Sequence, residues 1–284
     1  MISVIKNMIK GIVIGLANII PGVSGGTMAV SMGIYDKLIH SLTHLFKEFK
    51  KSICFLLPIL LGAVLAIAGS SFIITGMFEK FPFQTNLLFI GLIVGGLPAI
   101  IKKVKGHSFH PGYAVAFLLF FALVVGMALM GETEGRAADL SLSFLNVLKL
   151  FGVGVIASAT MVIPGVSGSM ILLLMGYYNP VISTIKEFIT ALTAGNMAEL
   201  LRCAGILLPF GIGVIIGIFA IAKLIEIIFE KFPMHAYWAI IGLIAASPIA
   251  IILAGELGAI TAVPVLTGLI TFAAGFIVSM KLGD

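Results

Sequence analysis

The chain has 284 residues, of which 60% are hydrophobic and only 10% are charged, and its mean hydropathy is +1.22. Soluble domains carry roughly 25% charged residues, so this composition excludes a soluble protein and indicates an all-α integral membrane protein. The net charge of +5 does not indicate a nucleic-acid partner, because the lysines gather in short loops beside apolar segments, as cytoplasmic loops do. Cys54 and Cys203 each begin an apolar span, and we interpret them as small apolar side chains rather than disulfide partners or metal ligands.

One 21-residue run occurs twice. Residues 19–39, IIPGVSGGTMAVSMGIYDKLI, return as residues 162–182, VIPGVSGSMILLLMGYYNPVI, and both copies contain an unbroken PGVSG. Each copy sits inside an apolar stretch, where Pro and Gly interrupt a helix at membrane depth. Two such interrupted segments at matching places are typical of the binding site of a transporter built from repeats.

The repeat extends along the chain. Three later motifs return after a constant offset: FLLP at 55–58 as ILLP at 206–209, FEKFP at 78–82 and again at 229–233, and GLIVGGLP at 91–98 as GLIAASP at 242–248. We therefore divide the chain into two membrane repeats, residues 1–140 and residues 141–284.

Each half contains an interrupted segment followed by three plain apolar spans. The expected elements are 9–45, 53–77, 86–101 and 112–130 in the first half, and 148–190, 204–228, 236–254 and 258–280 in the second. A helix needs about 20 apolar residues to cross a hydrocarbon core about 30 Å thick, so the ends of the two shorter spans, 86–101 and 236–254, are the least defined.

The interrupted segment is expected to turn back inside the membrane. The nine residues from Ile12 to Ile20 would form a helix about 13–14 Å long, roughly half the core. Lysines flank both ends of the first segment, which fits a re-entrant hairpin that enters and leaves on the cytoplasmic face. Three crossings per half then make the two repeats inverted. The alternative is four crossings per half and parallel repeats.

The hairpin topology places both chain termini in the cytoplasm. The residues on the cytoplasmic side are Lys6, Lys10, Lys37, Lys47, Lys50, Lys51, Lys102, Lys103, Lys105, Lys231 and Lys281, and those on the outer side are Lys80, Arg136, Lys149, Lys186 and Arg202. This excess of inner positive charge follows the usual bias of membrane proteins. Parallel repeats would separate Lys102–Lys105 from Lys47–Lys51 and fit that bias less well.

The motif residues predict a site for an anion near the middle of the membrane. A helix that restarts there presents N–H groups without intrahelical partners and a partial positive charge. Glycines allow close backbone approach, and hydroxyls add donors. The candidate binding residues are Asn18, Pro21, Gly22, Ser24, Gly25, Gly26 and Thr27 in the first copy, and Pro164, Gly165, Ser167, Gly168 and Ser169 in the second. The alternative is that these small residues only pack two hairpin tips together.

Charged residues near the spans are further candidates for contact with the ligand. They are Glu79, Lys80, Arg136, Arg202, Lys223, Glu226, Glu230 and Lys231. Those in the two FEKFP motifs are also consistent with interfacial turns in which Phe anchors the chain and Lys snorkels. Lys223 and Glu226, three apart on one helical face, can pair with each other. Either arginine could clamp a phosphate or remain a solvated loop charge.

Two histidines, His40 and His44, are four residues apart on an expected amphipathic helix. A metal site needs at least a third ligand, and the sequence indicates none, so we interpret the pair as an interfacial helix face. No metal or cofactor is expected. A coupling proton or cation is possible, with Asp36, Glu79, Glu226 and Glu230 as candidate proton carriers.

The two motifs in context resemble one known family. GLANIIPGVSGGTMAVSMGIYDKLI followed by ASATMVIPGVSGSMILLLMGYY is similar to the polyprenyl-phosphate transporter family, PopT, formerly a domain of unknown function, and the resemblance covers essentially the whole chain. It implies a flippase of the bacterial plasma (inner) membrane that moves undecaprenyl phosphate, the lipid carrier of cell-wall precursors, from the outer to the cytoplasmic leaflet. It also implies that the matching Pro, Gly, Ser and Thr residues of both motifs form the substrate site.

Two other functions remain open from the residues alone. An intramembrane undecaprenyl-pyrophosphate phosphatase would need a nucleophile with an acid or base and a phosphate-binding Arg or metal, and no Glu, His or Arg lies near either PGVSG in the sequence. We therefore expect a transporter rather than an enzyme. A secondary transporter of a small anion would use the same motifs but would need a water-filled path.

Overall fold

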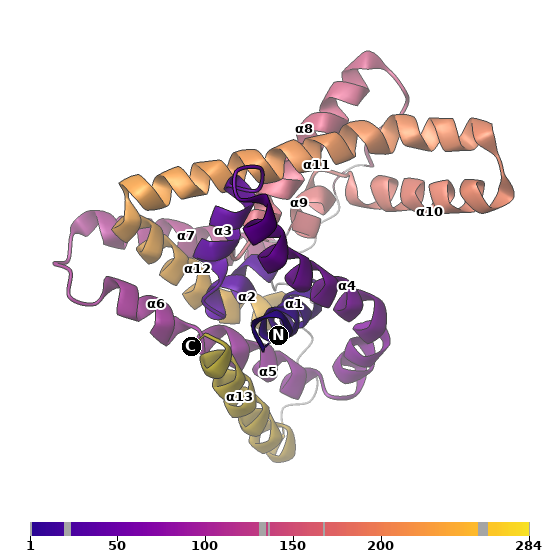
Figure 1. Ribbon diagram of the computed structural model, residues 1–284. Coiled ribbons are helices and arrows are strands. Elements are labelled where there is room, and N and C mark those ends of the chain that lie inside the picture. Colours follow the sequence, from indigo (N-terminus) through magenta and orange to yellow (C-terminus); the bar gives the residue numbers. More distant parts are fainter. Residues whose placement is uncertain are drawn as a thin grey trace. The chain divides into compact units, whose positions relative to one another are not determined.

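The computed structural model describes residues 2–19, 24–130, 135, 137–166, 168–254 and 261–283, and these residues form helices and connecting turns without any strand. In chain order the helices are α1 (Ile2–Ile19), α2 (Gly25–Ser31), α3 (Tyr35–Thr43), α4 (Phe49–Lys80), α5 (Pro82–Val94), α6 (Leu97–Val104), α7 (Pro111–Met130), α8 (Phe144–Val162), α9 (Gly168–Leu174), α10 (Tyr178–Ala194), α11 (Met197–Lys231), α12 (Pro233–Ala254) and α13 (Ala262–Gly283) (Figure 1).

The same order of helices occurs twice. In each half, a helix of 18 or 19 residues is followed by one of seven residues, α2 or α9. Next come α3 or α10 and the very long α4 or α11, which carry Pro58 and Pro209 at matching positions. The later part differs, because α5 and α6 in the first half correspond to the single α12 in the second.

Seven helical segments among the described residues are long and apolar enough to cross a membrane. They are Phe49–Ile67, Pro82–Val104, Pro111–Met130, Phe144–Val162, Met197–Lys231, Pro233–Leu253 and Ala262–Gly283. Six of these correspond to the six expected spans, so the chain is a multi-pass helical membrane protein. The seventh is α8, the limb that precedes the second break.

The limb before each break is longer than the nine residues expected. At 1.5 Å per residue, the 18 residues of α1 extend about 27 Å, close to the thickness of the hydrocarbon core. The expectation counted only residues after Lys10, which was treated as a flanking charge. In the structure Lys10 is buried, with 6% of its surface exposed, and its Nζ donates a hydrogen bond of 2.9 Å to the carbonyl oxygen of Met32.

By its contacts the chain forms two compact units, which we describe separately. Unit 1 comprises residues 1–129, 163–166 and 223–284, and unit 2 comprises residues 130–162 and 167–222. Unit 1 thus contains the described part of the first PGVSG motif together with Pro164, Gly165 and Val166. The division into sequence repeats near residue 140 is a separate matter and stays a prediction.

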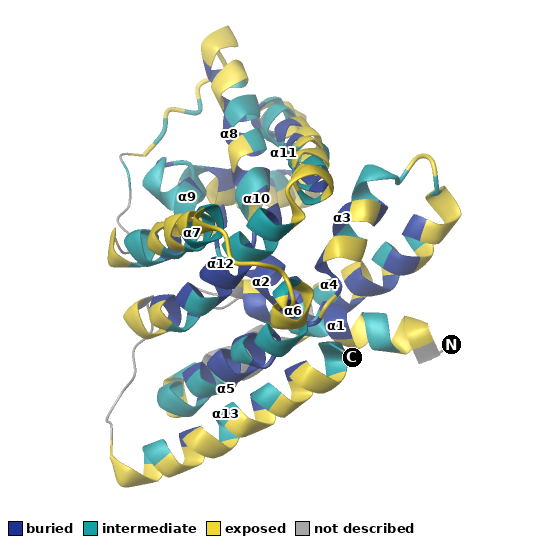
Figure 2. Cartoon of the chain, turned by 90° about the vertical axis from the view of Figure 1, so that its left-hand side faces the viewer, coloured by how far each residue is buried: buried dark blue, intermediate teal, exposed yellow. Residues whose placement is uncertain are grey.

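In unit 1, helices meet at glycines that let two backbones touch. A Cβ atom on Gly11 of α1 would lie 2.1 Å from the carbonyl oxygen of Ile59 in α4, and one on Gly91 of α5 would lie 2.1 Å from that of Phe272 in α13. α13 accordingly lies along α5 and turns its exposed residues outward (Figure 2). Larger side chains at these crossings would force the helices apart.

Unit 2 repeats the first of these crossings. A Cβ atom on Gly154 of α8 would lie 2.2 Å from the carbonyl oxygen of Phe210 in α11, and one on Gly213 would lie 2.1 Å from that of Phe151. Gly154 lies 143 residues after Gly11, the offset of the PGVSG motifs. The sequence repeat is therefore matched by a repeated helix contact.

A second interruption follows each motif, at a glycine within the segments that the sequence predicts to continue as helix. Gly33 (φ +65°) and Gly176 (φ +75°) adopt the left-handed conformation. In the first copy the N–H of Gly33 bonds to the oxygen of Val30, and that of Ile34 bonds to the oxygen of Ala29. The corresponding bonds recur in the second copy. This is the Schellman pattern that ends a helix, and α9 and α10 bend by 105° across it.

Candidate functional site

The first motif breaks the chain between α1, which ends at Ile19, and α2, which begins at Gly25. Ser24 is the N-cap residue of α2, with extended backbone angles of φ −104° and ψ 134°, and its side chain makes no capping hydrogen bond. The cap comes instead from Asn18, whose Oδ1 accepts the N–H of Gly25 at 3.1 Å. Asn18 therefore contacts the start of the motif helix directly.

The second motif meets the first within unit 1. Gly165 has φ +77°, a conformation that favours glycine, and its N–H donates a hydrogen bond of 2.7 Å to Oγ1 of Thr27. Thr27 is completely buried, and Pro164 beside Gly165 is also buried. Two candidate binding segments that lie more than 130 residues apart in the sequence thus touch each other.

The two copies differ in the residue that faces the motif helix. Met161 occupies the position of the second copy that corresponds to Asn18. In unit 2, a Cβ atom on Gly168 would lie 3.0 Å from Cγ of Met161, just as one on Gly25 would lie 2.7 Å from Oδ1 of Asn18. The thioether of Met161 is a weak acceptor, and the strong acceptors beside Gly168 are instead Oγ1 of Thr160 and the carbonyl oxygen of Ala157, which would lie 3.2 and 3.3 Å from that Cβ atom.

All seven residues of α2 are buried. Ser31, at its end, donates a hydrogen bond of 3.2 Å from Oγ to the carbonyl oxygen of Ile93 in α5. A Cβ atom on Gly96 would lie only 2.2 Å from Cα of Ser31, so the junction of α5 and α6 packs directly on α2. These contacts hold the motif helix in the interior of unit 1.

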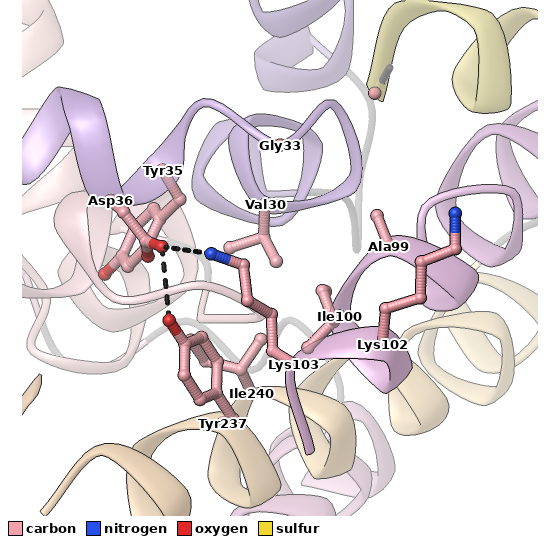
Figure 3. A pocket seen from close by; sticks show the side chains of 11 residues that line it. Val30, Gly33, Tyr35, Asp36, Ala99, Ile100, Lys102, Lys103, Tyr237 and Ile240 are labelled. Atoms are coloured by element: carbon pink, nitrogen blue, oxygen red, sulfur yellow. Dashed lines mark hydrogen bonds and ion pairs between the residues drawn. The ribbon is translucent and has the colours of Figure 1, made fainter. Parts of the chain in front are cut away.

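A polar pocket of about 420 Å³ lies in unit 1 near the end of α2 (Figure 3). Asp36 is its acidic group, and Oδ2 of this residue lies 3.7 Å from Nζ of Lys103 and accepts a hydrogen bond of 3.4 Å from the hydroxyl of Tyr237. Lys102 extends on the other side of the pocket from this cluster. Two lysines and one carboxylate leave an excess of positive charge.

A second, apolar pocket of about 440 Å³ lies between α1, α4 and α5 of unit 1. Its lining consists of Ile12, Val13, Leu16, Leu65, Ala66, Gly69, Met77, Leu88, Phe89 and Leu92. Leu16 precedes Asn18 by two residues on α1, so this pocket lies near the end of α1 at which the first motif begins.

Most of the charged candidates do not reach the motifs. Arg202 makes ion pairs of 2.6 Å with Glu187 and 2.5 Å with Glu199 in unit 2, so its guanidinium is already neutralised. Lys223 and Glu226 form the pair that their spacing indicated, with 2.6 Å between Nζ and Oε2. Four residues remain exposed at the ends of α4 and α11: Glu79, Lys80, Glu230 and Lys231.

Several candidates carry no structural statement. Pro21, Gly22, Arg136 and Ser167 lie outside the described residues. Gly26 is buried in the first turn of α2, whereas Ser169 is exposed in unit 2.

Two features were missed from the sequence. Lys10 is buried, although the sequence suggests a charge that flanks the membrane. Its place among apolar residues, one helical turn before Ile14, is the signal that could have indicated a position inside the helix. The pocket of Asp36, Lys103 and Tyr237 combines residues from three distant segments, and no local pattern joins them.

Together, the repeated interrupted helices and the apolar spans define a multi-pass helical membrane protein in which parts of both motifs meet. The chain belongs to the VCA0040-like family, described as undecaprenyl phosphate translocase-like, which it matches over residues 14–263. It is 32% identical over 281 residues to the polyprenyl-phosphate transporter of Staphylococcus aureus (strain NCTC 8325 / PS 47), covering 98% of this chain and 95% of that protein.

A second relative is the polyprenyl-phosphate transporter of Vibrio cholerae serotype O1 (strain ATCC 39315 / El Tor Inaba N16961). It is 29% identical over 198 residues, which cover 65% of this chain and 61% of that protein. No solved structure matches the chain. The relatives are transporters and not enzymes, which confirms the resemblance and the expectation of a transporter.

Proposed function

We propose that this protein carries undecaprenyl phosphate, or a closely related polyprenyl phosphate, from the outer to the cytoplasmic leaflet of a bacterial plasma membrane. The names of its relatives support the substrate. The main observation in support of a single binding site is the hydrogen bond from the N–H of Gly165 to Oγ1 of Thr27, because it brings parts of both PGVSG motifs together.

The charged head of the lipid is the difficult part to move. An unpaired charge in hydrocarbon is prohibitively costly, so protein groups must replace its water. The start of α2 supplies backbone N–H groups, which are the donors that phosphate oxygens accept at helix N-termini, and Ser24 beside them has a hydroxyl that is not used for capping. From the second motif, Gly165 adds its backbone in unit 1, and we propose Ser167, from the sequence motif alone, as a further hydroxyl donor.

The prenyl tail needs only an apolar surface. The pocket between α1, α4 and α5 is lined by aliphatic and aromatic side chains and lies near Asn18, where a head group at the first motif would place the adjoining carbons. Burial of the tail in this pocket is favourable by about 25 cal/mol per Å² of apolar surface only when the tail is transferred from water. Compared with a tail that stays in lipid, a tail in the pocket gains little free energy, and its role is to orient the head group.

On the cytoplasmic side, the lysine pocket is the proposed exit for the head group. Val30 and Gly33 at the end of α2 line it together with Lys102 and Lys103, and the topology predicted from the sequence has these lysines on the cytoplasmic side. α2 is about 10 Å long, so a phosphate leaving its first turn has a second cationic site within one short helix length.

The movement itself follows from the repeats. We propose that the two halves have inverted topology and that the interrupted segments are re-entrant, so that rocking of one half against the other opens the motifs to each leaflet in turn. The seven-residue α2 and α9 are too short to cross a membrane alone, and the 105° bend between α9 and α10 supports a chain that turns back. The coupling proton or cation is not assigned to a residue.

Binding of undecaprenyl phosphate to the purified protein, measured by native mass spectrometry, is the first test. Neutral polyprenol, the pyrophosphate form and inorganic phosphate serve as competitors. We expect selective retention of the lipid monophosphate and a weaker complex when Ser24→Ala is combined with Ser167→Ala. Equal retention of polyprenol would refute the head-group site. Release of phosphate from the pyrophosphate form would indicate a phosphatase, and full competition by inorganic phosphate would indicate a small-anion carrier.

A further inference from the structure

A cluster of two histidines and a buried glutamate in unit 1 lies apart from the motifs. Glu226 of α11 has only 8% of its surface exposed. Its Oε1 lies 3.2 Å from Nδ1 of His44 and 3.7 Å from Nδ1 of His40. The sequence showed the histidine pair without a third ligand, and the structure brings that third ligand from a helix more than 180 residues further along the chain.

The three atoms that face one another have the dimensions of a metal site. One ligand atom from each of His40, His44 and Glu226 lies within 4.8 Å of the other two. A tetrahedral Zn²⁺ ion bound at about 2.0–2.1 Å keeps its ligands about 3.3 Å apart. The His44–Glu226 distance already fits, and the His40–Glu226 distance of 3.7 Å is a few tenths of an ångström longer. The imidazole rings of His40 and His44 are stacked, with centroids 4.2 Å apart and planes 22° apart, so one of the rings must turn for both to direct a nitrogen at a single ion.

The surroundings hold these ligands in place. Lys223 donates to the other carboxylate oxygen of Glu226 at 2.6 Å, which orients the carboxylate. Oε1 faces the histidines and also accepts a hydrogen bond of 2.8 Å from the hydroxyl of Thr43, which lies 3.0 Å from Nδ1 of His44 and would turn away when an ion binds. Glu48 places Oε1 3.9 Å from Nε2 of His40, on the side of the ring away from the cluster. A carboxylate that accepts the ring N–H of a histidine ligand fixes its tautomer and orientation, and at 3.9 Å Glu48 would need to come closer to His40 to form that hydrogen bond.

At the matching place in unit 2, Glu187, Glu199 and Cys203 also lie close enough to hold an ion, but a cationic side chain of the protein is already bound there. The repeat in the sequence pairs His44 with Glu187, Glu48 with Glu199 and Lys51 with Arg202. There the guanidinium of Arg202 bridges both carboxylates and supplies the cation itself. In the first half Lys51 pairs with Glu48 at 2.7 Å, and His44 takes the place of the second acid, Glu187.

We propose that His40, His44 and Glu226 bind one divalent transition-metal ion, with Zn²⁺ the best match to two imidazoles and one carboxylate. Three protein ligands leave a fourth position for water, and His40, with 48% of its side chain exposed, leaves that position open to solvent. The ion would link α3, which follows the first motif, to the last turns of α11. This inference does not depend on the lipid substrate.

The test is metal binding by the full-length protein after removal of any affinity tag and treatment with a chelator. Co²⁺ is the first probe, because a tetrahedral site gives an intense visible absorption that hexaaqua Co²⁺ lacks, and Zn²⁺ is then added to displace it. We expect one ion per chain, and at least tenfold weaker binding in His40→Ala and in His44→Ala. Glu48→Gln should weaken binding about 10–100-fold, as loss of an outer-shell partner does.

The matched control is His107→Ala, which removes an exposed histidine of the same chain from a loop outside the cluster. It should bind Co²⁺ like the original protein. Helix content and lipid-phosphate binding are measured for every variant, so that a misfolded protein is recognised and so that failure here is separate from failure of the transport proposal. If His40→Ala folds and binds Co²⁺ as tightly as the control, or if no visible absorption develops, the proposal is wrong.

Discussion

Replacing Thr27 by valine should separate the two motifs. Valine keeps the shape of threonine but removes Oγ1, the acceptor of the Gly165 N–H at 2.7 Å. A buried donor left without a partner costs about 1–3 kcal/mol. Because Gly165 is only partly buried, we expect a loss of about 1–2 kcal/mol in the free energy of unfolding, which is roughly a factor of 5–30 in the folding equilibrium.

The matched control is Thr27→Ser, which keeps the hydroxyl and removes one methyl group. Loss of that buried methyl costs about 0.8 kcal/mol, so the serine variant should be the more stable of the two. The chain has a single tryptophan, Trp238, and it packs edge-on against Phe117 within unit 1. Its fluorescence therefore reports the unfolding of the unit that contains Thr27, in mixed micelles with increasing denaturing detergent.

Function provides a second readout of the same pair of variants. We expect Thr27→Val, but not Thr27→Ser, to lose affinity for undecaprenyl phosphate, because the backbone groups of Gly165 would no longer be held beside α2. If the valine variant is as stable as the serine variant and binds the lipid equally well, the bond does not organise the site, and the reasoning that joins the motifs is refuted.

Three further substitutions test the backbone and the charge of the site. Gly165→Ala should lower the free energy of unfolding by at least about 1–2 kcal/mol, because a Cβ atom is disfavoured at φ +77°. The control is Gly126→Ala, which has open space around it and should be neutral or stabilising by up to about 1 kcal/mol. Equal unfolding midpoints for the two variants would contradict this expectation. Gly11→Ala should lower stability more than the same control, since its Cβ would meet a carbonyl oxygen of α4 at 2.1 Å, and an unchanged cross-linking distance between α1 and α4 would argue against that contact. Asn18→Asp should leave the helix cap intact but weaken lipid-phosphate binding, because a carboxylate at the start of α2 competes for the same partial positive charge; native mass spectrometry showing tighter binding would oppose an anion site there.

The contacts between residues on different helices could not be predicted from the sequence, for one physical reason. Patterns of hydropathy and spacing report which residues share a helix face, but not which helices meet. Glu226 pairs with Lys223 on its own helix, as the spacing indicated, yet its contact with His44 depends on how α3 packs against α11. The pocket of Asp36, Lys103 and Tyr237 depends in the same way on the packing of three helices.

Some of what was missed had a local signal. The glycine of MGIY and its counterpart in MGYY stand where a helix-ending glycine is expected, and the same backbone bonds form at both. For Lys10 the local signal pointed to the wrong position, because a charge near the start of an apolar run normally marks the membrane boundary. Here the carbonyl of Met32 accepts its hydrogen bond, and that acceptor exists only because α2 folds back beside α1.

The sequence alone determined the membrane class, the repeated PGVSG breaks and the family, because composition, proline and glycine act locally and the motifs are specific. It also indicated an anion site from the chemistry of an interrupted helix. Only the tertiary structure decided that Thr27 and Gly165 touch, that Asn18 caps α2 and that Glu226 joins the two histidines. These contacts arise from helices that approach closely at glycines such as Gly11 and Gly91, and the packing of whole helices fixes them.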